Sequence, residues 1–199
     1  MGQYYYPTII RNKGAQKDEV QYYAHDYDNG LKLTEHSYIG NNFVETVIAQ
    51  LYNNPGRLFW CGDYANKDDF LDEEDWNQIR KANKKYSVKI LPDGSHTSTY
   101  PKPEEMIRGR FILNHTKRLY IDMEEYEHYA PKASQWMGCP FHPIPLLTAV
   151  GNGRGGGDYE GINEDSIGIW AGDLLETQDV KPNGYTNVST LSVLHFVER

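Results

Sequence analysis

Short strand-like runs joined by turn-forming segments constrain this fold more than any other feature of the sequence. Residues 3–11 (QYYYPTIIR) and 19–25 (EVQYYAH) flank the turn-rich segment NKGAQKD, a pattern that predicts an N-terminal hairpin. Pro7 favours an edge position for the first strand, because proline cannot donate a ladder hydrogen bond. RGRFILN and KRLYIDM predict a second hairpin across His115 and Thr116. Further strands are expected at 57–62, 86–90, 146–150, 166–172 and 190–198.

Helical periodicity is strong in only two segments. Apolar residues recur at helical spacing in 41–52, where Asn42 can act as the N-cap with Glu45 three residues on. Residues 72–83 begin with acids and end with bases, which suits the helix dipole, and their narrow apolar face predicts a surface helix. We expect an exposed loop over 91–105 and a helical turn over 124–129. Because strands outnumber helices and are mostly joined as hairpins, the sequence predicts a single α+β domain over residues 1–199, with a mostly antiparallel sheet and two main helices.

The charge balance limits the partners of the chain. With 28 acidic and 20 basic residues the formal net charge is -8, which disfavours binding of duplex nucleic acid. Binding of a small anionic ligand by one or two arginines is still compatible with this charge. No apolar run approaches the ~18 residues that cross a bilayer, and the start of the chain has no signal pattern, so we expect no membrane partner. The two isolated cysteines, Cys61 and Cys139, fit a reducing cytosol. No metal or cofactor is indicated.

A glycine-rich segment, GNGRGGGDYEG, occupies residues 151–161 and contains six glycines. It matches G-x-G-x-x-G formally, but no amphipathic helix follows and there is no Walker lysine, so the dinucleotide and P-loop interpretations fail. Glycine-rich backbone can still aim successive amides at an anion, and an arginine can add a bidentate contact to phosphate. The alternative is a hairpin loop without a ligand. The candidate ligand-binding residues here are Gly153, Arg154, Gly155, Gly156, Gly157, Asp158 and Tyr159.

The strings FWCGDY (59–64) and IWAGDL (169–174) form a short sequence repeat, in which an apolar residue and Trp are followed by a small residue, Gly and Asp. Trp60 and Trp170 could flank a flat ring, while Asp63 and Asp173 accept hydrogen bonds from ribose hydroxyls or an exocyclic amine. The alternative is two core tryptophans followed by ordinary Gly-Asp turns. A composite nucleotide site requires the strand ends near residues 25, 62, 151 and 172 to open into one pocket.

The segment AHDYDNGLKLTEHSYIGNN (24–42) concentrates His25, Asp26, Asp28, Glu35 and His36. Such a set can provide part of a metal site, and His25 can act as a general acid or base because the pKa of a free histidine lies near neutrality. We count His25 and Asp26 among the candidate ligand-binding residues. The alternative is a turn, since DYDNG is a strong turn signal. The acidic cluster DDFLDEED (68–75) is interpreted as a solvated face.

The strings YAHDYDNGLKLTEHSYIGN and HPIPLLTAVGNGRGGGDYEG resemble a family of small hypothetical proteins from bacteriophages and other mobile elements, and the resemblance spans most of the chain. It implies a viral protein of the bacterial host cytosol with an accessory or anti-defence role. Our leading hypothesis is a non-catalytic binder that sequesters a phosphorylated, nucleotide-like molecule, such as an immune signal. A second hypothesis is a nucleotide-processing hydrolase that uses His25, Asp26 and Asp28. A third is an inhibitor that contacts a host defence protein. The oligomeric state is open, a homo-oligomer included.

Overall fold

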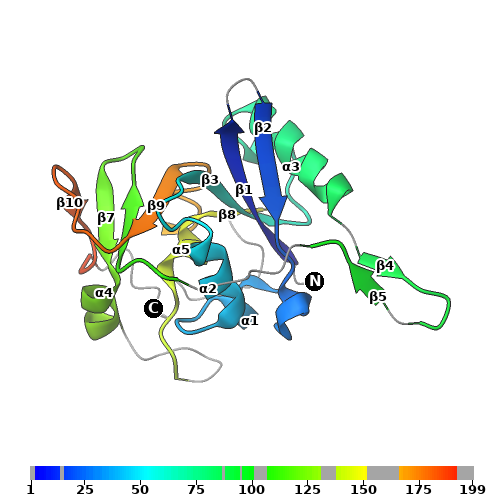
Figure 1. The fold of residues 1–199 in the computed structure, drawn as a ribbon, viewed down its shortest axis with the longest axis horizontal. Coiled ribbons are helices and arrows are strands. Elements are labelled where there is room, and N and C mark those ends of the chain that lie inside the picture. The colour runs from blue at the N-terminus through cyan, green and yellow to red at the C-terminus, as the bar shows by residue number, and fades with distance from the viewer. Residues whose placement is uncertain are drawn as a thin grey trace.

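The main sheet holds eight strands in the part of the chain that the computed structural model describes, residues 3–13, 16–86, 88–94, 96–100, 107–130, 138–151 and 166–191. Its order is β10-β7-β6-β9-β3-β1-β2, and β8 pairs with β3 (Figure 1). All pairs are antiparallel except β10 with β7 and β8 with β3, which confirms an α+β fold with a mostly antiparallel sheet. The strands are β1 (Tyr5–Lys13), β2 (Gln16–Gln21), β3 (Gly56–Gly62), β6 (Phe111–Asn114), β7 (Leu119–Asp122), β8 (Ala149–Val150), β9 (Leu174–Gln178) and β10 (Thr186–Asn187).

Helices cover both faces of the sheet. The two longest among the described residues are α2 (Asn42–Ala49) and α3 (Glu73–Lys85), the two that the periodicity predicts. Asn41, rather than Asn42, is the cap of α2, where its side chain accepts hydrogen bonds from the amides of the first turn. The shorter helices are α1 (Leu33–His36), α4 (Met123–Tyr129) and α5 (Pro143–Leu147), with 3-10 turns η1 (Ala24–Tyr27) and η2 (Lys67–Asp69).

Side-chain alternation in β3 divides the core into two layers. Leu58 and Trp60 belong to the larger cluster, which also contains the apolar side chains of α2 and α5. Phe59 and Cys61 belong to a smaller cluster with Ile79 of α3. The α3 face of the sheet carries this smaller cluster and, beside it, the candidate site.

The two predicted hairpins, β1–β2 and β6–β7, are both present. The edge position expected for β1 is wrong, because β1 lies between β2 and β3. Pro7 is tolerated there because the β1–β2 ladder begins only at Thr8. Its carbonyl, on the side of β2, accepts from the amide of Tyr22 beyond the end of that strand. The nitrogen of Pro7 faces the same side, so its missing N–H affects only the end of the β1–β2 ladder and none of the hydrogen bonds to β3.

Three other predictions of strands or loops differ from the structure. Residues 166–172 form turns rather than a strand, since Gly168 and Gly172 have φ of +74° and +76°. The strand predicted at 146–150 is reduced to β8, because α5 occupies 143–147 with a proline in its first turn. The loop expected over 91–105 contains β5 (His96–Ser98), which pairs with β4 (Val88–Ile90) to form a hairpin that projects beyond α3 (Figure 1). Most of the strand predicted at 190–198 lies outside the described residues.

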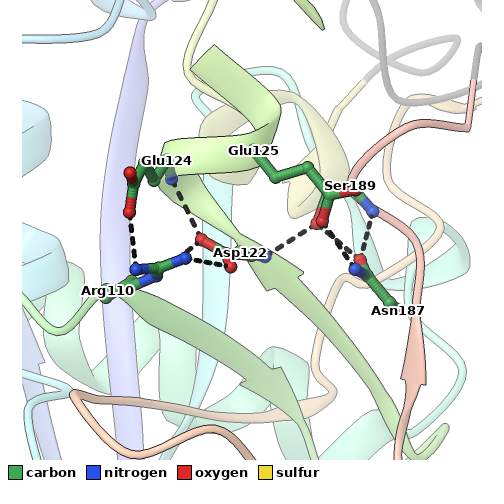
Figure 2. Close-up of polar contacts among 6 residues, drawn as sticks. All are labelled: Arg110, Asp122, Glu124, Glu125, Asn187 and Ser189. Carbon is green, nitrogen blue, oxygen red and sulfur yellow. Dashed lines mark hydrogen bonds and ion pairs between the residues drawn. The ribbon is translucent and has the colours of Figure 1, made fainter. Parts of the chain in front are cut away.

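A polar network fixes the segment after β10 to β7 and α4 (Figure 2). The hydroxyl of Ser189 accepts a 2.8 Å hydrogen bond from the amide of Asp122 and donates to the side-chain oxygen of Asn187 at 2.6 Å. The amide nitrogen of Asn187 in turn donates to Glu125 at 2.6 Å. Arg110 holds the Asp122 carboxylate with two hydrogen bonds, at 2.9 and 2.7 Å, and also pairs with Glu124. These side chains satisfy one another, which fits a structural role.

Candidate ligand-binding cavity

A cavity of about 770 Å³ lies on the α3 face of β3, and we refer to it as the Phe59 cavity. Its apolar wall consists of Phe59, Phe70, Leu71, Ala149, Val150, Ile167, Ile169 and Ala171. Its polar groups are Arg57, Asp69, Asp75, Thr116 and Asp173, and three glycines, Gly151, Gly168 and Gly172, complete it. A volume of this order accommodates a nucleotide-sized molecule, since small-molecule pockets span about 300–1,000 Å³.

Strand β3 supplies the floor of the cavity. Successive side chains of a strand point to opposite faces, so Arg57 and Phe59 share the α3 face while Leu58 and Trp60 point away. The Arg57 guanidinium lies 5.6 Å from the centroid of the Phe59 ring. Phe70 packs against Phe59 with ring centroids 5.7 Å apart and is only half-buried, so it offers ring surface to a ligand.

Arg57 and Asp75 form the central charge pair. Both terminal nitrogens of Arg57 donate to the Asp75 carboxylate at 2.5 Å, and its Nε donates to the carbonyl oxygen of Gly172 at 2.7 Å. Asp75 is buried in the first turn of α3, where the helix dipole also favours a negative charge. The interpretation of residues 68–75 as a solvated acidic face is therefore wrong for Asp75, which arginine pairing allows to be buried.

Asp173 forms a second polar corner of the Phe59 cavity. Its carboxylate accepts a 2.7 Å hydrogen bond from the side chain of Asn114 and pairs with the Lys117 ammonium. The hydroxyl of Thr116 accepts from the amide of Leu174 at 2.9 Å. The turn between β6 and β7 thus holds Asp173 against the cavity, where a carboxylate oxygen can accept from a ligand hydroxyl or amine.

Described residues on either side of 152–165 line the Phe59 cavity. Gly151 is the first residue of the segment GNGRGGGDYEG, Ile167 and Gly168 come six and seven residues after its end, and all three line the cavity. The candidate residues Gly153, Arg154, Gly155, Gly156, Gly157, Asp158 and Tyr159 lie outside the described residues. Of the four strand ends that the composite site requires, those near 151 and 172 open into this cavity.

The two tryptophans do not line the Phe59 cavity. Trp60 is 0% exposed and Trp170 is 1% exposed, and both belong to the larger core cluster on the opposite side of β3. The indole N–H of Trp60 donates to Nε2 of His36 at 2.9 Å. The stacking role proposed for these indoles is wrong, and the alternative of two core tryptophans fits. The short sequence repeat is not a structural repeat either, because Trp60 lies in a strand and Trp170 in a turn.

The residues near 25 and 63 are also placed away from the cavity wall. Asp63 accepts a hydrogen bond from the amide of Tyr4 at 3.0 Å, while His25 stacks on Tyr23 with centroids 5.9 Å apart. Asp26 lies in η1, and Asp28 follows it with a left-handed φ of 55°. The turn interpretation of DYDNG fits this geometry, although the left-handed residue is Asp28 instead of Asn29 or Gly30.

The described residues offer neither a cluster of metal ligands nor an accessible nucleophile at His36 or Cys61. These residues contain no cluster of three or more His, Cys, Asp or Glu side chains that could hold a metal. His36 is enclosed, and burial lowers its pKa to about 4. Burial raises the pKa of the Cys61 thiol to about 12, which removes the reactive thiolate at neutral pH.

Sequence reasoning missed Arg57, Phe59, Phe70, Asp75 and Thr116 as cavity residues. One signal was present, because an arginine directly before the apolar run LFWC needs a partner where the strand buries it. The pairing of Arg57 with a helix residue 18 positions later follows from tertiary packing and leaves no local pattern.

None of the helices in the described ranges has the length and apolar character needed to cross a membrane. Comparisons of the chain with protein-family models, curated proteins and solved structures find no match.

Proposed function

We propose that this protein binds a small, phosphorylated, nucleotide-like molecule in the Phe59 cavity and sequesters it without chemical change. One observation carries the proposal: a cavity of nucleotide size combines aromatic surface with polar groups, and its wall includes Gly151, the first residue of the glycine-rich segment.

The ring and sugar of the ligand would use the described wall. Phe70 and the apolar side chains offer a surface for a flat ring, and Asp69 and Asp173 offer oxygens for hydroxyl or amine donors. The three aspartates of the wall outnumber Arg57, so this cavity suits the donor-rich part of a nucleotide better than its phosphate.

The polar groups of the Phe59 cavity favour binding over covalent chemistry. The described lining residues include no histidine, serine or cysteine, and the hydroxyl of Thr116 is an acceptor for a backbone amide. Acyl or phosphoryl transfer by a protein nucleophile needs an activated side chain beside its base. We therefore place the hydrolase hypothesis, with His25, Asp26 and Asp28, second.

Sequestration also suits the resemblance to phage proteins. A protein made in the host cytosol can neutralise a nucleotide immune signal by holding it in a cavity, and such an anti-defence role needs no turnover. A homo-oligomer and contact with a host defence protein are compatible with the same cavity.

The test is identification of the ligand that travels with the protein. The chain is purified from bacteria with an active nucleotide-signalling defence and from resting bacteria, then heat-denatured, and the released molecules are identified by mass spectrometry. We expect an intact nucleotide in near-stoichiometric amount. Release of a cleaved product instead would favour the hydrolase, and recovery of no nucleotide from either culture would refute the proposal.

A variant pair makes this test specific to the Phe59 cavity. Ala171→Phe adds a ring to the wall and should abolish the bound nucleotide, whereas Val180→Phe adds the same ring at an exposed position outside the wall and should not. Circular dichroism and thermal melting establish that both variants fold. Equal nucleotide recovery from Ala171→Phe and the native protein would place the ligand elsewhere.

A further inference from the structure

A second cavity, of about 500 Å³, lies at the end of β1, β3 and β9, and we refer to it as the Arg11 cavity. Arg57 of β3 lies between Ile10 of β1 and Leu174 of β9 in the strand register, and all three line it. Arg57 also lines the Phe59 cavity, so the two cavities share this side chain as a wall. Arg57 therefore separates the two cavities, and a ligand that occupied both would have to lie alongside its side chain.

The two cavities differ in charge. The described wall of the Arg11 cavity contains two arginines, two asparagines and no carboxylate, whereas the wall of the Phe59 cavity contains three aspartates. Because Asp75 already neutralises Arg57, the cationic character of the Arg11 cavity comes mainly from Arg11. A phosphoryl group is thus favoured at the end where Arg11 lies and disfavoured near the aspartates.

The guanidinium of Arg11 has a hydrogen-bond donor without a described acceptor. One terminal nitrogen donates to the carbonyl oxygens of Gln50 at 2.6 Å and Asn54 at 3.4 Å. Its Nε is buried and has no acceptor within the described ranges, and no carboxylate there forms an ion pair with it. Asp18, opposite Arg11 in the β1–β2 register, attracts it only at longer range, and burial lowers the pKa of the guanidinium. An anion beside Arg11 would compensate this buried charge.

We propose that the Arg11 cavity binds the phosphoryl group of the ligand, with Arg11 as the charge that recognises it and the side-chain amides of Asn12 and Asn54 as further donors. The inference rests on the proposed function for the ring and sugar, which occupy the Phe59 cavity. The ligand class becomes specific: a nucleotide whose phosphates extend from the sugar past Arg57 toward the end of β1.

The experiment compares three probes by isothermal titration calorimetry: inorganic pyrophosphate, the four common nucleosides and their 5′-diphosphates. We expect a diphosphate to bind at least tenfold more tightly than its nucleoside. Arg11→Gln should remove this advantage and abolish pyrophosphate binding, while nucleoside binding is retained. Asn12→Asp, at an exposed residue that tolerates substitution better, should have the same effect by introducing a negative charge. Arg80→Gln, an identical change at an exposed arginine outside both walls, should bind as the native protein does.

The outcomes separate the two proposals. If Arg11→Gln and Asn12→Asp bind diphosphate and pyrophosphate as the native protein does, the phosphate site is refuted, even though nucleoside binding would uphold the Phe59 cavity. If pyrophosphate binds and depends on Arg11 but no nucleoside binds, the phosphate site is supported and the proposed function fails. If a folded native protein binds none of the probes, the phosphate site is refuted.

Discussion

Acid should destabilise this protein through two buried histidines, His36 and His142. Nε2 of His36 accepts from Trp60 and its Nδ1 lies 2.9 Å from the carbonyl oxygen of Gly30, so the neutral ring fits both contacts. Nδ1 of His142 accepts from the amide of Ile144 and caps α5. Burial lowers the pKa of His36 to about 4, and burial together with the Arg108 charge lowers that of His142 to about 3.

The sign and size of the effect follow from proton linkage. Both folded pKa values lie below the value of 6.5 for a free histidine, so the stabilisation is complete above that pH and is lost as the pH falls toward the folded values. At pH ~5.5 each unfolded histidine is largely protonated, and each should lower the free energy of unfolding by about 1.4 kcal/mol relative to pH ~8. The two together remove about 3 kcal/mol, a large share of a typical stability of about 5–15 kcal/mol.

A variant comparison isolates the contribution of His142. The Glu45 carboxyl has its pKa raised by burial, so its protonation acts in the opposite direction and partly offsets the loss in the native protein. His142→Asn keeps a side-chain acceptor at the N-cap and removes the titration. Urea unfolding at pH ~8 and pH ~5.5 should then show a loss about 1.4 kcal/mol smaller than in the native protein. His128→Asn, at an exposed position of α4, should leave the loss unchanged. An equal loss in His142→Asn and the native protein would refute the reasoning.

Two further predictions concern other buried groups. Ser189→Ala removes the acceptor for the buried amide of Asp122 and a partner of Asn187, so the free energy of unfolding should fall by about 1–3 kcal/mol in urea titrations. An unchanged value would show that these hydrogen bonds of Ser189, drawn in Figure 2, do not contribute to stability. Cys61 is buried and its pKa is raised to about 12, so a thiol reagent at neutral pH should modify Cys139 in the folded protein and Cys61 only in denaturant. Peptide mass spectrometry identifies the labelled cysteine. Equal labelling of both cysteines without denaturant would contradict the burial of Cys61.

Local patterns predicted the parts of the fold that are held by local contacts. The two hairpins and the helices α2 and α3 follow from turn residues, caps and periodicity over a few residues. Strand β9 was missed although Leu175 and Thr177 alternate as buried residues, because the exposed Leu174 obscures the period and the segment is only five residues long. The partners of β9 are β6 and β3, tens of residues away, and no local pattern specifies such pairing.

The site was harder to predict because the acids at the start of α3 have two possible roles, favourable contact with the helix dipole and pairing with a partly buried arginine. Acids at residues 72–75 are expected at the start of a helix for the dipole alone, so nothing in the sequence demanded that one of them be buried. Arg57 gave such a reason, because a guanidinium that a strand partly buries is stabilised by an acidic partner. The partner had to be an acid that packing brings to the face of Phe59, and Asp75 meets this condition from the first turn of α3. A charge at the start of an apolar strand was therefore a better guide to the cavity than the repeated tryptophans, whose size and apolar character direct them into the core.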